Sequence, residues 1–300
     1  MKLNQLRDVL AIAERGSLRA AARHLGLAQP ALSRSIHELE RELNAPLFER
    51  RARGMTLTPM GVAFARRASV AVKEVQRARE EVEQLQGGVG GTIVAGLSIA
   101  AHIALLPRAL APFRKRYPSV RLHIIEGLYP TLESGIEDGS VDFYIGPRPG
   151  RAVPSDLIEE KLADNTRTIL GRKGHPLGNA RSLRDLIDAE WATTSITLEA
   201  EDELGELFAG YQLPKPRLAL RSQSALTLIV SLANTDLLAM VPVQWTAFDV
   251  TARALVPILV KEKLSAPPLV MIRRGALPLT PAAEYFVDLM RRGSLGAASS

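Results

Sequence analysis

Four neighbouring residues have the chemistry and the spacing to read the edges of base pairs. Gln29, Pro30, Ser33 and Arg34 lie within two turns of one another if residues 29–43 are helical. A glutamine amide can pair with adenine, an arginine guanidinium with guanine, and a serine hydroxyl with base edges or phosphates. Proline can contact the methyl group of thymine. These residue types are typical of a helix that enters the major groove of double-stranded DNA.

A preceding helix and a glycine turn are expected to position these side chains. Ser17 can cap a helix over residues 18–25, and Gly26 can adopt the left-handed conformation that ends it. The apolar residues of this helix share one face: Leu18, Ala21, Ala22 and Leu25. In the second helix, the residues expected to face the core are Ala31, Ile36 and Leu39. The pattern predicts a helix-turn-helix, although an ordinary helical hairpin has the same pattern.

A basic segment follows the second helix. Arg50, Arg51 and Arg53 precede Gly54, and residues 55–58 alternate weakly like a short strand. A basic hairpin in this position is typical of a wing that contacts DNA phosphates, while a basic surface loop is the alternative for any single arginine. The first 86 residues carry fifteen Lys/Arg and ten Asp/Glu, and the remainder carries 23 and 22. This concentration of positive charge indicates a polyanionic partner.

A long helix is predicted from Pro59, after a Thr58 cap, to about Gln86. Its apolar residues recur every 3.5 positions: Phe64, Ala68, Ala71, Val75, Ala78, Val82 and Leu85. Such a repeat is typical of a coiled coil, and burial against a folded domain is the alternative. Charged residues flank the stripe, so we favour self-association. A dimer would present two recognition helices to a dyad-symmetric site.

Beyond the glycines of residues 87–91, strands and helices alternate. The order β-α-β-α-β over residues 92–145 predicts a parallel sheet that binds ligands at the carboxyl ends of its strands. A second alternating unit covers residues 166–260, and the strand 269–273 with the helix 281–292 is expected to return to the first unit. The predicted fold class is therefore α/β with an N-terminal all-α winged helix-turn-helix. The predicted domains are a DNA-binding domain (1–58), a linker helix (59–87) and an effector domain (88–300), with subdomain I at about 91–162 and 267–300 and subdomain II at about 163–266.

Several function classes are disfavoured. The chain has no cysteine, which excludes disulfides and thiolate chemistry. No phosphate-binding loop, metal-ligand spacing or dinucleotide fingerprint occurs, so no cofactor is expected. The first residues are interrupted by Asp8, Glu14 and Arg15, which fits neither a signal peptide nor a membrane span and favours the cytoplasm. This also argues against a solute-binding protein for transport.

One enzymatic alternative remains. Residues 96–100 read GLSIA, which approaches the nucleophile elbow of α/β hydrolases and would make Ser98 a nucleophile. The last glycine of that motif is missing, and no Asp and His follow with recognisable signatures. We therefore expect no enzymatic activity.

The whole chain resembles the LysR-type transcriptional regulators. The matching segments are SLRAAARHLGLAQPALSRSIHELE, LNAPLFER, TLTPMG, GGTIVAG, VDFYIGP, GRKGHPL and LLAMVP. The resemblance implies a winged helix-turn-helix, a dimer formed by the linker helix, and two α/β subdomains like those of a periplasmic binding protein. It also implies a homotetramer, as a dimer of dimers on a bent promoter, and a small-molecule inducer in the cleft.

Two residues depart from the family pattern. Ala28 stands where the family usually has Ser or Thr, so the cap and the phosphate contact of that hydroxyl are missing. Asn44 replaces a usual glycine, which is harmless because asparagine tolerates the same left-handed conformation.

The resemblance also assigns effector contacts. By family position, these are Ser98, His102, Tyr129, Thr131, Thr194, Ser195, Thr197, Gln223 and Ser224. Each Ser or Thr alone could be only a helix cap, and their convergence at strand ends is the stronger signal. Free N–H groups at helix starts suit a carboxylate or sulfonate, so a small organic anion is expected. The other histidines, His24, His37, His123 and His175, are expected to have no ligand role.

These features together predict a ligand-responsive regulator. We expect the effector to close the cleft and to shift how the paired DNA-binding domains lie on DNA. Promoter bending and the access of RNA polymerase would change as a result.

Overall fold

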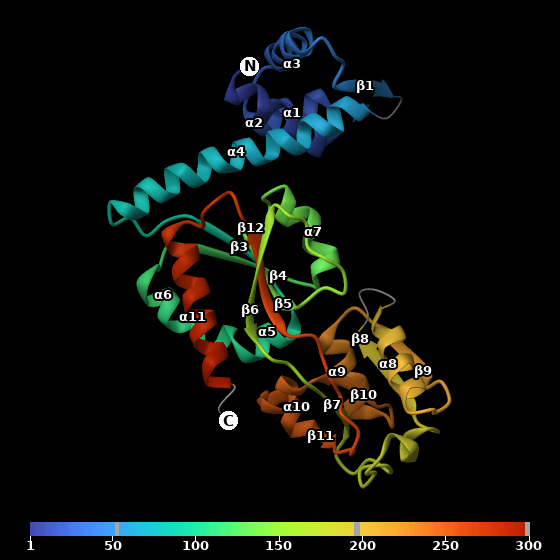
Figure 1. Cartoon of the computed structure of the whole chain (residues 1–300). Helices are drawn as coiled ribbons and strands as arrows, with labels where there is room; N and C mark the ends of the chain where they lie inside the picture. The colour runs from blue at the N-terminus through green and yellow to red at the C-terminus, as the bar shows by residue number, and fades with distance from the viewer. Residues whose placement is uncertain (52–53, 195–198, 298–300) are drawn as a thin grey trace. The chain divides into compact units, whose positions relative to one another are not determined.

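A computed structural model describes residues 1–51, 54–194 and 199–297 (Figure 1). The chain forms two compact units, which are described separately. Unit 1 comprises Met1–Gly90 and Ser134–Val141, and unit 2 comprises Gly91–Glu133 and Asp142–Ser300. In the described ranges, no helix combines the length and the apolar character needed to cross a membrane.

Unit 1 begins with three helices, a hairpin and a long helix. These elements are α1 (Leu3–Arg15), α2 (Leu18–Leu25), α3 (Gln29–Leu43), β1 (Phe48–Arg51), β2 (Gly54–Leu57) and α4 (Pro59–Leu85). Ser17 caps α2 by accepting the N–H of Ala20, and Gly26 is left-handed with φ +66°, as predicted. The core joins Val9 and Ile12 of α1 to Leu32, Ile36 and Leu39 of α3. The prediction that Ala31 faces this core is wrong: Ala31 is exposed, and Leu32 lies one position further round the helix, on the buried stripe.

Thr58 fixes the start of α4 from both sides. Its hydroxyl accepts the N–H of Gly61 at 3.0 Å and donates to the carbonyl of Pro46 at 2.7 Å. Gly61 is required here because a Cβ would lie 2.0 Å from the carbonyl oxygen of Leu47. Along the predicted stripe, Ala68 is buried, whereas Val82 and Leu85 are 54% and 72% exposed. The C-terminal part of the stripe is therefore uncovered within the single chain.

Unit 2 contains a five-stranded sheet in the order β4-β3-β5-β12-β6. Its strands are β3 (Thr92–Leu97), β4 (Arg121–Glu126), β5 (Phe143–Pro147), β6 (Leu157–Ala163) and β12 (Leu269–Arg274). Strands β3, β4 and β5 are parallel, as predicted, and β12 runs antiparallel to β5 and β6. The predicted return of the C-terminal strand to this sheet is confirmed. The strand β6 was not predicted, because Glu159, Glu160 and Lys161 interrupt its apolar residues.

Four helices accompany this sheet: α5 (Ile99–Ala104), α6 (Leu106–Arg116), α7 (Tyr129–Glu137) and α11 (Pro281–Ala297). Helices α6 and α11 lie side by side (Figure 1), and the ring centroids of Phe113 and Phe286 are 5.0 Å apart. The segment between β3 and β4 forms two helices. Helix α5 starts at Ile99, and the chain re-forms as α6 after Leu105, because Pro107 cannot donate to the carbonyl four residues earlier.

The rest of unit 2 is built from two smaller sheets. The antiparallel sheet β10-β7-β11 uses β7 (Arg167–Arg172), β10 (Ala239–Pro242) and β11 (Leu255–Ile258). The parallel pair is β8 (Glu190–Thr194) and β9 (Arg217–Ser222), and a bridge from Trp191 to Leu238 joins the two sheets. The remaining elements are η1 (Leu183–Leu186), α8 (Glu199–Gly210), α9 (Ala225–Asn234), η2 (Val243–Ala247) and α10 (Asp249–Ala254). The chain is thus a helical module with a two-stranded wing, followed by two α/β subdomains.

Candidate DNA-reading surface and effector cavity

The N-terminal half of α3 presents the predicted DNA-reading residues. Gln29, Pro30 and Arg34 are exposed, and Ser33 is half-buried. Ala28 precedes the helix without a side-chain cap, as its sequence predicts. The carbonyl of Ser33 lies 2.6 Å from Nδ1 of His37, which places that ring along the same helix surface. An amide, a hydroxyl and a guanidinium in the N-terminal half of a helix are groups that can recognise base edges in the major groove.

Two carboxylates hold α3 in place, and sequence reasoning missed both. Asp8 of α1 is buried and accepts a hydrogen bond from Ser35 Oγ at 2.5 Å. Glu40 accepts the backbone N–H groups of Leu47 and Phe48 at 2.8 and 3.2 Å, which ties the end of α3 to the first wing strand. The sequence does contain a signal for the first of these contacts, because Asp8 is a charged residue beside the apolar stripe of α1.

The wing is a two-stranded hairpin seated on the turn between α1 and α2. Met55 donates its N–H to the carbonyl of Gly16 at 2.8 Å. Gly54 has φ +135°, and a Cβ there would lie 2.3 Å from the carbonyl oxygen of Gly16. Glycine at position 54 therefore allows the close approach of the wing to this turn.

The wing arginines differ in their surroundings. Arg50 and Arg51 are exposed, and Arg53 lies outside the described residues. Arg51 donates to Glu49 at 2.6 Å, and this guanidinium lowers the pKa of the Glu49 carboxyl below its ordinary value. Within the described ranges Arg50 has no such partner. Arg50 is therefore the more available of the two for a phosphate.

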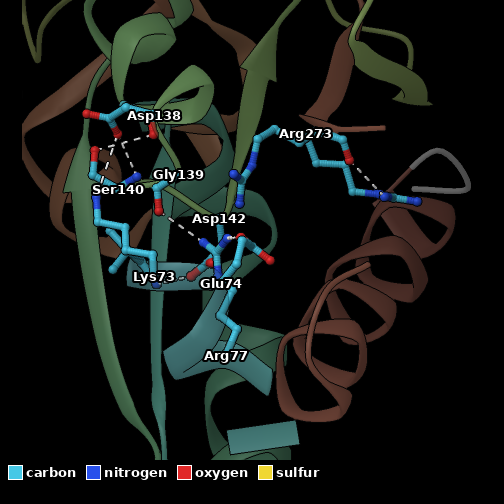
Figure 2. Close-up of polar contacts among 11 residues, drawn as sticks. Lys73, Glu74, Arg77, Asp138, Gly139, Ser140, Asp142 and Arg273 are labelled. Atoms are coloured by element: carbon cyan, nitrogen blue, oxygen red, sulfur yellow. Dashed lines mark hydrogen bonds and ion pairs between the residues drawn. The ribbon is translucent and has the colours of Figure 1, made fainter. Parts of the chain in front are cut away.

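The linker helix makes a polar contact with the turn that follows α7 (Figure 2). Lys73 Nζ lies 3.7 Å from a carboxylate oxygen of Asp138, and Arg77 donates to the carbonyl of Gly139 at 3.0 Å. Glu74 accepts from Arg77 at 2.5 Å, and the Asp138 carboxylate also accepts the N–H of Ser140 at 2.7 Å. We call this set the linker contact. It anchors the middle of α4 within unit 1.

A cavity of about 590 Å³ lies between the two subdomains of unit 2. Three predicted effector residues line it: Ser98, Tyr129 and Gln223. The buried hydroxyl of Ser98 accepts the N–H of Ala101 at 3.3 Å and so caps α5. The volume and the mixed polar and apolar wall suit a small organic molecule.

Other predicted contacts do not reach the cavity wall. His102 is turned toward its own helix, with Nδ1 3.0 Å from the carbonyl of Ser98. Thr131 donates to the carbonyl of Leu128 at 2.8 Å, and Ser224 accepts the N–H of Thr227 as the cap of α9. The hydrogen bonds of these three side chains are local, and for Thr131 and Ser224 a local role is the alternative to ligand contact given above. The side chains of Thr194, Ser195 and Thr197 lie outside the described residues, although the neighbouring Thr193 lines the cavity.

Sequence reasoning missed the charged residues of the cavity wall. They are Glu126, Arg148, Arg151, Arg167, Glu203 and Glu206. Each arginine has a carboxylate partner: Arg148 with Glu159 at 2.6 Å, Arg167 with Glu203 at 2.5 Å, and Arg151 with Glu133. The signal was the position of Arg148 and Arg151 just after β5, because ligands bind beyond the carboxyl ends of parallel strands.

A pair of tyrosines forms the floor of the cavity on the sheet side. Tyr129 and Tyr144 pack edge to face with their ring centroids 5.9 Å apart. Tyr144 donates to the carbonyl of Pro147 at 3.2 Å, and burial raises the pKa of its hydroxyl well above the ordinary value. Gly146 leaves the space for this arrangement, since a Cβ there would lie 2.1 Å from Tyr144 Oη.

Both parts of the chain match models of known domain families. Residues 3–62 match the bacterial regulatory helix-turn-helix protein, lysR family, and residues 86–294 match the LysR substrate binding domain. The regulator GalR of Pseudomonas putida is 26% identical over 291 residues, covering 96% of this chain and 73% of that protein. The SDS degradation transcriptional activation protein of a Pseudomonas species is 28% identical and covers 96% of this chain and 95% of that protein. The crystal structure of full-length CbnR complexed with its target DNA superposes with a TM-score of 0.70 at 21% identity, covering 98% of this chain and all of that chain.

Proposed function

The chain belongs to the LysR family of bacterial transcriptional regulators, and on that basis we propose which of its surfaces bind DNA, other copies of the chain and an effector. It is a DNA-binding regulator with an effector-binding domain. The proposal for DNA rests on the polar residues in the N-terminal half of α3. This helix is fixed by a hydrogen bond to Asp8 of α1 and by the contact of its own Glu40 with the start of the wing. Gln29, Pro30, Ser33 and Arg34 read bases, while Arg50, Arg51 and Arg53 hold phosphates.

Selection of DNA by the full chain from a pool of random duplexes tests this assignment. We expect a site with dyad symmetry whose half-sites are separated by about one helical turn or a multiple of it. Footprinting on the selected site should protect both half-sites. Selection of sequences without symmetry, or no enrichment at all, would contradict the assignment.

The chain acts as a homodimer through α4, and two dimers form a homotetramer. Support for the dimer comes from the heptad stripe, whose residues Val75, Val82 and Leu85 are exposed in the single chain. Coiled-coil pairing would remove these side chains from water. Support for further association comes from Leu226 and Val230, which are exposed on the apolar helix α9 of the effector domain.

The effector is a small organic anion bound in the 590 Å³ cavity. The arginines of the wall support an anionic group, since guanidinium and carboxylate form charge-assisted, often bidentate hydrogen bonds. The effector changes the access of RNA polymerase to the promoter by altering the DNA bend. Support for a binding role comes from His102, whose Nδ1 lies 3.0 Å from the carbonyl of Ser98 rather than pairing with its hydroxyl. We therefore propose regulation without catalysis, in the cytoplasm where promoter DNA lies.

Helix α7 is the proposed route from effector to DNA. It starts at Tyr129 on the cavity wall and ends at Glu137, just before the turn that contacts Lys73 and Arg77 of α4. Movement of Tyr129 would therefore be transmitted to the dimer helix. Lys73→Glu and Asp138→Lys should each change the DNA bend angle, and the double variant should restore it. Unchanged bending in both single variants would contradict this route.

A further inference from the structure

We propose that the effector carries two opposite charges, an anionic group that contacts the arginines after β5 and a cationic group that contacts the glutamates of α8. This inference rests on the proposed function, because it concerns the ligand of the same cavity. It narrows a small organic anion to a zwitterion of the amino-acid kind. It starts from the charges on the two sides of the cavity.

Both sides of the cavity carry charges of both signs. Subdomain I contributes Glu126, Arg148 and Arg151, and subdomain II contributes Arg167, Glu203 and Glu206. The ion pairs found for the arginines stay within one subdomain: Arg148 with Glu159, Arg151 with Glu133, and Arg167 with Glu203. Across the described part of the wall, no ion pair joins one subdomain to the other. A bound ligand can supply that link.

The two arginines of subdomain I are the ones whose guanidiniums a ligand can reach. The side chains of Arg148 and Arg151 are 47% and 62% exposed, and ion pairs in contact with water contribute little to stability. A ligand carboxylate can therefore bind the remaining N–H donors of these guanidiniums, while Glu159 and Glu133, whose side chains are only 21% and 19% exposed, stay paired. Arg167 differs, because its side chain is only 16% exposed.

The glutamates make a purely anionic ligand unfavourable. Every arginine of the wall is already neutralised, while Glu126 and Glu206 have no ion pair within the described residues. A ligand carboxylate would add a negative charge to a cavity that already holds the carboxylates of Glu126 and Glu206. An ammonium group on the same ligand would compensate that charge. Glu206 on α8 lies on the opposite subdomain from Arg151. A zwitterion can thus bridge the cavity, with its carbon chain against the apolar side chains of Leu128, Met240 and Trp245.

The test is titration calorimetry on the full chain at neutral pH with three matched sets of probes. The first set contains α-amino acids and ω-amino acids of three to six carbons. The second contains the same acids without the amino group, and the third contains the same amines without the carboxylate. We expect binding by members of the first set, with their matched acids and amines at least tenfold weaker.

Two variants assign the charges, and two more serve as controls. Arg151→Gln and Glu206→Gln should each weaken the zwitterion at least tenfold. The matched controls are Arg172→Gln and Glu190→Gln, whose ion pairs with Asp236 and Arg217 lie away from the cavity, and they should bind like the parent chain. The selected DNA site should be bound by all four, which shows that each variant is folded.

Two results would overturn the inference. If the acids bind as tightly as the zwitterions and Glu206→Gln changes nothing, the effector is a simple anion and the proposed function stands without its second charge. If no probe of the three sets binds a chain that still binds its DNA site, the proposal that the effector is a zwitterion of this kind is wrong. Failure of the same preparation to select any DNA would instead count against the proposed function.

Discussion

Ser35 of α3 donates its hydroxyl hydrogen to the buried carboxylate of Asp8 on α1, across 2.5 Å. This is a polar contact within an otherwise apolar helix junction, and it fixes the rotation of the helix that presents Gln29 and Arg34. Ser35→Ala would leave the carboxylate buried with one donor fewer, which costs about 1–3 kcal/mol of folding free energy. Urea unfolding should show this loss, and the double variant Asp8→Ala with Ser35→Ala should recover part of it. Ser155→Ala, at an exposed serine, is the control and should have no effect.

Base-reading and phosphate-binding residues should respond differently to sequence and salt. Arg34→Ala should relax the sequence preference at one position, at a cost of about 1–3 kcal/mol for the preferred base. Arg50→Ala and Arg51→Ala should weaken all duplexes alike and flatten the salt dependence. Binding assays on matched and mismatched sites over a range of salt concentrations separate the two effects. Uniform weakening by all three variants would contradict the division.

Glu49 should reduce the contribution of Arg51 to DNA binding. Its carboxylate holds the guanidinium at 2.6 Å, and that contact lowers the pKa of Glu49, so the group stays charged at neutral pH. Glu49→Gln removes a negative charge from the wing and frees Arg51, and DNA affinity should rise severalfold with a steeper salt dependence. Because the folded pKa is depressed, the pairing is present above the ordinary pKa and is lost as pH falls through the folded value. An unchanged affinity of Glu49→Gln would show that Arg51 does not reach phosphate.

The exposed stripe of α4 should control dimer formation. Val82→Glu places a charge in the seam of the proposed coiled coil and should shift the chain toward monomer at micromolar concentration. Val62→Glu is a matched control, because Val62 is 56% exposed on the same helix but lies outside the seam. Analytical ultracentrifugation measures both. If both variants associate to the same extent, the predicted dimer seam on α4 is wrong.

Gly146 should be required for the shape of the effector cavity. A Cβ at this position would lie 2.1 Å from Tyr144 Oη and 2.8 Å from the Cβ of Ser98, so Gly146→Ala must displace a tyrosine or the start of α5. We expect a destabilisation of about 1–3 kcal/mol and loss of effector binding. Gly210→Ala is the control, since the space around its Cβ is open and the residue does not line the cavity. Thermal unfolding with and without ligand distinguishes a general loss of stability from a local loss of binding.

The helical module was predictable because its signals are local. Ser17, Gly26, Asn44 and Thr58 each act through hydrogen bonds or backbone angles within a few residues, and the structure places all four as caps or left-handed turns. The parallel pairing of β3, β4 and β5 and the return of β12 were also predictable from the alternation of strand and helix patterns. The strand β6 did not, because its charged residues conceal its apolar positions.

The cavity wall was only partly predictable, because its partners come from distant positions. Ser98, Tyr129 and Gln223 follow strand ends, which a sequence reveals. The pairing of Arg148 with Glu159 and of Arg167 with Glu203 depends on how separate strands and helices approach. For Thr131 and Ser224 the sequence could not decide between capping and ligand contact, and the structure shows local hydrogen bonds for both.

The proposed transmission from effector to DNA should depend on the number of residues in helix α7. Each residue of a helix advances the chain by about 1.5 Å and turns it by about 100°. One residue inserted within α7 would leave Tyr129 in the cavity wall but would swing Asp138 about a quarter of a turn away from Lys73. An insertion of four residues would nearly restore the direction while moving the turn by about 6 Å. The proposed signalling through this helix should therefore vary periodically with its length, because Asp138 faces Lys73 only at certain rotations of the helix.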